Sequence, residues 1–152
     1  MAIHNSKESM LTESLRELVE VADYCINFRK DLADWGSQGC YGYPAAILLL
    51  NICDAIGQFK LGGSVRNHFN ILNDSGYYNL ELSNEEIKSI YEGYRCCLVH
   101  EAVLQERFFL HIGNTGELIF EFTDNRPIFR LVPFLELTRI VVDQFISELN
   151  ID

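Results

Sequence analysis

Arg95 and His100 are the residues of this chain whose types and spacing best suit chemistry. An imidazole accepts a proton near neutral pH, so His100 would serve as a general base. A planar guanidinium donates two hydrogen bonds to negative charge that builds up during attack on a phosphate, so Arg95 would bind that charge. Loss of either side chain should slow such a reaction by about 100-fold or more.

Both residues fall on a predicted helix that begins at Ser83, forms a capping box with Glu86 and runs to about Gln105. At roughly 100° per residue, one face of this helix is apolar and is expected in the core. That face holds Ile87, Ile90, Tyr91, Tyr94, Cys97 and Leu98.

A second apolar stripe, made of Cys96, Val99 and Val103, lies on nearly the opposite side of the same helix. Arg95 and His100 flank this stripe, roughly 140° apart, so a single helix holds them away from each other. The stripe needs a cover, which is either another part of the chain or a second copy of the protein. A two-fold axis through the stripe, with antiparallel helices, would bring Arg95 of one chain to His100 of the other. We therefore predict a homodimer with this stripe in its interface.

The spacing of Arg95, four residues and then His100, within Tyr94–Glu101, resembles the signature of the HEPN family. Residues 45–57 also resemble the second helix of small bacterial HEPN-like proteins, and the similarity covers roughly residues 10–105. The resemblance implies a dimeric helical bundle in which the arginine and histidine of both chains meet in a cleft. In active members that cleft cuts RNA without a metal, through attack by the 2′-hydroxyl. Cys96 stands where the family usually has Asn or Asp.

The resemblance implies that the chain is a metal-independent endoribonuclease, related to toxins or to defence. Its partners would be an RNA substrate or an antitoxin-like protein. The alternative is a non-catalytic HEPN-like dimer that binds a protein or a nucleotide. The identity of Cys96 and the acidity of the chain favour this alternative, whereas Arg95 and His100 favour the enzyme.

Structural roles compete with the catalytic ones. Arg95 would equally pair with Glu92, Glu101 or Asp54 to hold the helices together, and His100 would be an ordinary residue at a helix edge. Asp54 sits in an apolar helix, where a carboxylate needs a partner. It either orients Arg95 or His100, in a supporting role shared with Cys96 and Glu101, or forms a structural pair. His68 and His111 are predicted to be ordinary residues.

The composition sets further bounds. Twelve Lys and Arg face 22 Asp and Glu, which gives a net charge of -10, argues against any nucleic-acid role and makes DNA an unexpected partner. Screening beyond roughly 10 Å still permits a local basic site. The five cysteines form no CxxC pair and no zinc-like cluster with histidine, so we expect reduced thiols, no metal and no cofactor. The chain shows neither a signal peptide nor a membrane span, so a cytoplasmic protein is expected.

The hydrophobic periodicity predicts one mainly α domain over residues 1–152, an up-and-down bundle of four long helices and one short helix. The first helix is expected from Thr12 or Ser14, where Ser14 and Glu17 have capping-box form. The second is expected over residues 44–59 and the short one after Ser64. The third begins at Ser83, as above.

A small β-hairpin is expected before the last helix. Its strands are residues 107–112 and 117–122, joined by a turn over 113–116, and residues 128–132 form a third short strand. The last helix is expected from Pro133, with a buried stripe that packs on the second helix. The stripe holds Phe134, Leu137, Thr138, Val141, Phe145 and Leu149.

Overall fold

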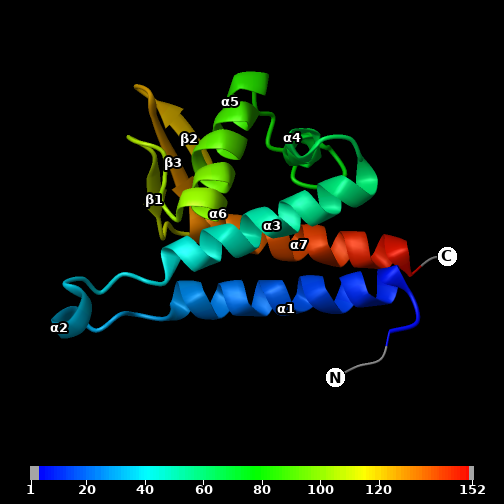
Figure 1. Cartoon of the computed structure of the whole chain (residues 1–152), viewed down its shortest axis with the longest axis horizontal. Coiled ribbons are helices and arrows are strands. Elements are labelled where there is room, and N and C mark those ends of the chain that lie inside the picture. Colours follow the sequence, from blue (N-terminus) through cyan, green and yellow to red (C-terminus); the bar gives the residue numbers. More distant parts are fainter. Residues whose placement is uncertain (1–3, 151–152) are drawn as a thin grey trace.

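Three long helices lie side by side in the computed structural model, which describes residues 4–150 (Figure 1). They are α1 (Lys7–Asn27), α3 (Gly42–Lys60) and α7 (Leu131–Leu149). Helix α3 contacts both of the others and is apolar nearly all round, so its side chains fill the centre of the molecule. Its buried residues are Ala45, Ala46, Leu49, Leu50, Ile52, Cys53, Ile56 and Gly57.

The predicted start of the first helix is wrong. Helix α1 begins at Lys7 because the Ser6 side chain accepts a hydrogen bond from the Ser9 amide and caps it. Ser14 and Glu17 therefore lie inside the helix. The predicted position of the last helix is confirmed, since α7 packs on α3 and α1 and its buried residues include Phe134, Thr138, Val141 and Phe145.

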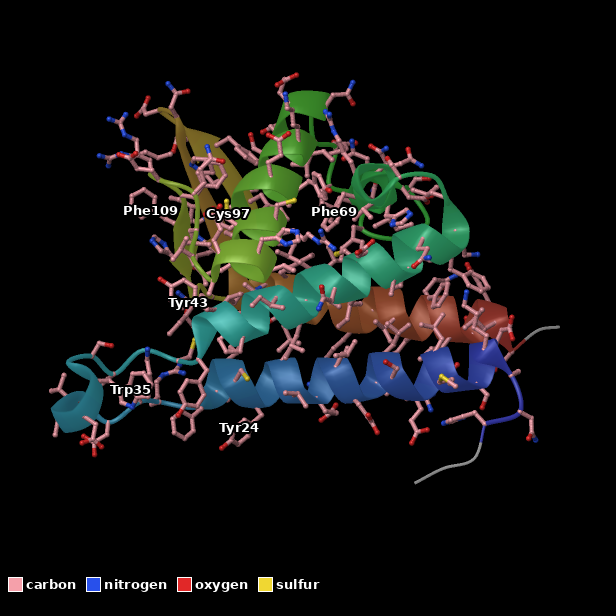
Figure 2. All side chains as sticks on the ribbon, viewed as in Figure 1. Tyr24, Trp35, Tyr43, Phe69, Cys97 and Phe109 are labelled. Atoms are coloured by element: carbon pink, nitrogen blue, oxygen red, sulfur yellow. The ribbon has the colours of Figure 1, made fainter. Side chains whose placement is uncertain are left out.

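An arm joins α1 to α3 and projects beyond the three helices in Figure 1. It carries the single-turn helix α2 (Leu32–Trp35), which Asp31 caps and Gly36 ends with a φ of 71°. The ring of Tyr41 stacks on Phe28 with 4.5 Å between centroids and meets Trp35 edge-on. Figure 2 shows Trp35 out on this arm, well away from Cys97.

The third predicted helix is present but differs in its conformation and its end. It consists of α5 (Asn84–Ser89), the π-helical segment η2 (Ile90–Cys96) and α6 (Cys97–Glu101). The Ser83–Glu86 capping box is confirmed. The helix stops at Glu101 rather than Gln105, because Ala102 takes a left-handed conformation with a φ of 59°. In Figure 1 this helix rises steeply from α3, whereas α1 and α7 run alongside α3.

The strands form a sheet of order β1-β3-β2, from β1 (Phe109–His111), β2 (Phe120–Thr123) and β3 (Arg126–Arg130). The predicted pairing across residues 113–116 is wrong, because β1 pairs with β3 in parallel and not with β2. The hairpin is β2–β3, which are antiparallel. Its two turn residues, Asp124 and Asn125, have φ values of 49° and 58°, as a two-residue turn of type I′ requires.

A short helical segment links α3 to α5. It contains α4 (Val65–His68), which Ser64 caps as predicted, and the 3-10 turn η1 (Phe69–Asn73). Within residues 4–150, no single helix has the length and hydropathy needed to cross a membrane. Helix α3 and the segment 65–73 meet the two requirements only as a pair, across a bend of 97°.

Candidate functional site

Arg95 points from η2 toward helix α3. One of its Nη atoms lies 3.4 Å from Oδ2 of Asp54, and its guanidinium carbon lies 5.8 Å from the centroid of the Tyr91 ring. Its Nε is buried and has no hydrogen-bond partner among the described residues. The side chain as a whole keeps 17% of its surface exposed, so Arg95 lies at the edge of the core.

Asp54 is shared between Arg95 and a second, buried side chain, the imidazole of His68. The Nδ1 atom of His68 lies 2.6 Å from Oδ1 of Asp54, and its Nε2 lies 3.1 Å from the carbonyl oxygen of Gly63. Only 6% of the His68 side chain is exposed, against 21% for Asp54. The sequence analysis predicted that the Asp54 carboxylate needs a partner. The structure gives it two, Arg95, which was among the predicted partners, and His68, which was not.

Gly57 explains why His68 reaches Asp54. A Cβ atom on Gly57 would lie 2.7 Å from the carbonyl carbon of His68 and 2.8 Å from its Cα, so α4 approaches α3 this closely only because position 57 is glycine. The close approach sets the start of η1 against α3. His68 then lies next to Asp54, one turn before Gly57 on α3.

His100 lies near the end of α6 and is exposed. Within residues 4–150 its side chain makes no hydrogen bond and no ion pair with another side chain. One chain therefore does not bring His100 and Arg95 together, because Arg95 contacts α3 and His100 faces solvent. Glu101 is exposed as well, and neither it nor Glu92 pairs with Arg95, whose ionic partner is Asp54.

The predicted apolar stripe is only partly present on the helix. Val99 is 43% exposed on α6, and Cys96 is half-buried at the end of η2. Val103 is exposed but lies beyond the helix end at Glu101, so its predicted place on the stripe is wrong. The hydrogen bond between Tyr91 and Cys96, together with burial, raises the pKa of the Tyr91 hydroxyl. Cys96 thus contacts the aromatic ring that lies under Arg95.

Hydrogen bonds from η2 to the sheet hold the helix that carries the candidate site in position. The Tyr94 hydroxyl lies 2.7 Å from the carbonyl oxygen of Phe109 and 2.9 Å from that of Pro127. Burial raises the pKa of this hydroxyl well above its ordinary value. Gly93, the preceding residue, leaves room for the ring of Phe108. A π-helical turn often marks a functional segment, because it displaces one residue from the regular helical register.

The cluster of Asp54, His68 and Arg95 can bind an anion. Both nitrogens of His68 face acceptors, a carboxylate and a carbonyl, so both bonds form only when both nitrogens carry protons. In that state His68, which lies closer to Asp54 than Arg95 does, neutralises the carboxylate. The positive charge of Arg95 then has no counter-charge within the cluster. With both nitrogens of His68 protonated, the cluster would be a local positive site in a chain of net charge -10.

His68 is the member of the cluster that sequence reasoning missed. The available signal was the need of Asp54 for a partner in an apolar helix, but nothing local points to a residue 14 positions later. No group of three or more His, Cys, Asp and Glu residues within 4–150 is arranged to hold a metal ion. A surface hollow of about 630 Å³ is lined by residues such as Ser6, Lys60 and Glu148 and includes neither Arg95 nor His100.

Comparison of the chain with protein-family models, with curated proteins and with solved structures found no match.

Proposed function

We propose that the chain is an HEPN-like dimer that cleaves single-stranded RNA without a metal ion, with His100 as general base and Arg95 as phosphate binder. The observation that carries the proposal is the contrast between the two side chains. His100 is exposed and unengaged, as a base that must meet a substrate needs to be, while Arg95 is anchored and keeps unpaired donors. The fold is mainly helical, with a small sheet before the last helix, as the proposal requires.

A second copy of the chain would complete the site. Val99 lies between Arg95 and His100 in the sequence and has 43% of its surface exposed, which a two-fold contact would bury. With the two α6 helices antiparallel, Arg95 of one protomer would approach His100 of its partner. Each of two equivalent clefts would then hold one base and one anion binder.

The chemistry follows from these two groups. The imidazole of His100 takes the proton of the 2′-hydroxyl, and the 2′-oxygen forms a bond to the adjacent phosphorus. The bond from phosphorus to the 5′-oxygen breaks, and that oxygen takes a proton from solvent. Arg95 donates hydrogen bonds to the non-bridging oxygens, on which negative charge increases in the transition state. The products are a 2′,3′-cyclic phosphate and a 5′-hydroxyl.

The test is cleavage of a set of single-stranded RNAs in EDTA, with the ends of the products identified. We expect His100→Ala and Arg95→Ala each to lower the rate by about 100-fold or more at an unchanged melting temperature. His111→Ala is the matched control, because His111 is an exposed histidine on β1 outside the site. Activity that survives in purified His100→Ala would belong to another site or to a contaminant.

Mixing the two inactive variants tests the composite cleft. A heterodimer of His100→Ala and Arg95→Ala chains contains one cleft with both wild-type residues if each cleft takes them from different chains. We expect activity to return on mixing. No return would contradict a cleft that needs one residue from each protomer.

The second candidate function is a non-catalytic dimer that binds a partner protein or a nucleotide. The observation that favours it is the Asp54 carboxylate beside Arg95, together with the net charge of -10, since both oppose the approach of a polyanion. Wild-type protein that cuts none of a broad set of RNAs would leave this candidate as the better one.

A further inference from the structure

We propose that His68 is a positioning residue that neutralises Asp54 and so keeps the positive charge of Arg95 free to bind a phosphate group. This inference deepens the proposed function and rests on its assignment of Arg95 as the anion binder. It adds a residue, His68, that lies on another element of the chain and does not touch the substrate.

The hydrogen-bond partners of His68 define its charge state. Nδ1 lies 2.6 Å from a carboxylate oxygen and Nε2 lies 3.1 Å from a carbonyl oxygen, and both of these atoms are acceptors only. A neutral imidazole has a single N–H and would leave one buried nitrogen facing an acceptor without a proton between them. The doubly protonated ring satisfies both contacts.

Two distances then show which neighbouring side chain pairs with the Asp54 carboxylate. Its Oδ1 lies 2.6 Å from His68, whereas its Oδ2 lies 3.4 Å from Arg95, at the edge of hydrogen-bonding range. Asp54 therefore pairs mainly with His68. Arg95 retains a buried Nε without a partner, and its side chain keeps 17% of its surface exposed, so it has both the charge and a spare donor for an anion.

The groups around His68 keep the cluster positive. From α3 it faces Asp54, whose other oxygen is contacted by Arg95 of η2, and Arg95 in turn lies over the ring of Tyr91. From α1, Lys7 lines the same open hollow as His68, and these two are the ionisable residues among those that line it. With His68 protonated, the trio of His68, Asp54 and Arg95 carries one net positive charge. With His68 neutral, it carries none.

The test is titration of the protein with inorganic sulfate, whose charge is constant over the range used. The signal is the Arg95 Nε–H resonance of arginine-labelled protein, recorded at about pH 5.5 and again at about pH 8. We expect wild type to bind sulfate at least about 5-fold more tightly at the lower pH, a coupling typical of linked sites. His68→Gln should bind weakly at both values, and His111→Gln should behave like wild type.

Removal of the carboxylate supplies the decisive second variant. In the double variant His68→Gln, Asp54→Asn, the charge of Arg95 is free again, so sulfate binding should return and should not depend on pH. Retained pH dependence in His68→Gln, or no recovery in the double variant, would overturn the inference. If His68→Gln does not fold, the imidazole ¹⁵N shifts of wild-type His68 decide, since a neutral ring at about pH 5.5 contradicts the proposal.

The outcome separates this inference from the proposed function. Sulfate binding that follows the expected pattern in a protein that cleaves no RNA supports the inference and refutes the enzyme. RNA cleavage that needs Arg95, but whose KM and pH profile are the same in His68→Gln, supports the enzyme and refutes the role of His68.

Discussion

Replacing Gly93 with alanine adds one methyl group where η2 meets Phe108. A Cβ atom at this position would lie 2.5 Å from Cδ2 and from Cζ of the Phe108 ring, and closer still to Cε2. The ring also packs against Tyr94, with 5.2 Å between centroids, which limits how far it can move. The methyl group and the ring cannot both keep their places, so the ring or the helix must move.

The size of the effect follows from what has to move. Forcing an extra methyl group into a packed contact costs about 1–3 kcal/mol. Expulsion of the half-buried Phe108 ring costs a similar amount, at most about 3 kcal/mol. Alanine is favoured over glycine in a helix by about 1 kcal/mol, which offsets part of this. We expect Gly93→Ala to lower the free energy of unfolding by up to about 2 kcal/mol.

A double-mutant cycle with Phe108→Ala makes the prediction sharper. Once the ring is gone, the methyl group meets no obstacle and only the helix preference of alanine remains. In the Phe108→Ala background, Gly93→Ala should therefore raise the free energy of unfolding by about 0.5–1 kcal/mol. Urea unfolding followed by far-ultraviolet circular dichroism is the suitable assay. Fluorescence of the single tryptophan is not, because Trp35 is 59% exposed on the arm.

Equal destabilisation in both backgrounds would refute this reasoning. It would mean that the π-helical backbone itself rejects alanine and that Phe108 has no part in the effect. Stabilisation by Gly93→Ala in the wild-type background would show instead that the ring moves aside at no cost.

Three further predictions concern the core, the pH dependence and the dimer. Phe145 is fully buried, so Phe145→Ala should lower the free energy of unfolding by about 3 kcal/mol or more; a loss below about 0.5 kcal/mol would contradict its place in the core. Hydrogen bonds from Lys60 and Tyr77 lower the pKa of Glu148 from 4.5 to about 2. Stability from Glu148 is therefore present above about pH 4.5 and is lost as the pH falls toward 2. After screening it is worth about 1 kcal/mol, and it should be absent from acid titrations of Glu148→Gln. Val99→Glu should give a folded monomer by light scattering, and a variant that stays dimeric would place the interface elsewhere.

Local patterns along the chain were enough to predict much of the fold. The apolar periodicity of residues 44–59 and 133–149 predicts two buried helices, and both are present as α3 and α7. The Ser83–Glu86 capping box and the Ser64 cap also predict their helix starts correctly. Such signals depend on interactions between residues three or four positions apart, so a short stretch of sequence includes all the residues involved.

Other features depended on contacts between distant residues. Residues 113–116 are rich in turn-forming types, yet β1 pairs with β3 and not with β2. Parallel strands cannot be joined by a tight turn, so their pairing depends on a longer connection and cannot be recognised from a local turn pattern. The helix ends at Glu101, and the Gln105 amide then turns back to donate to the carbonyl oxygen of Gly93. Nothing within a helical turn of Ala102 specifies that return, so the predicted helix was too long and Val103 was misplaced.

The candidate site likewise combines features that local sequence predicts with features that only tertiary contacts decide. Arg95 and His100 stand out by residue type and spacing, and the position of Asp54 in an apolar helix predicts that it needs a partner. Which partner it finds was decided by tertiary structure. Gly57 lets α4 approach α3, and this approach places His68 against one oxygen of Asp54 while η2 brings Arg95 to the other. Burial and charge at a site depend on which elements pack together, and the sequence specifies that packing only through the fold as a whole.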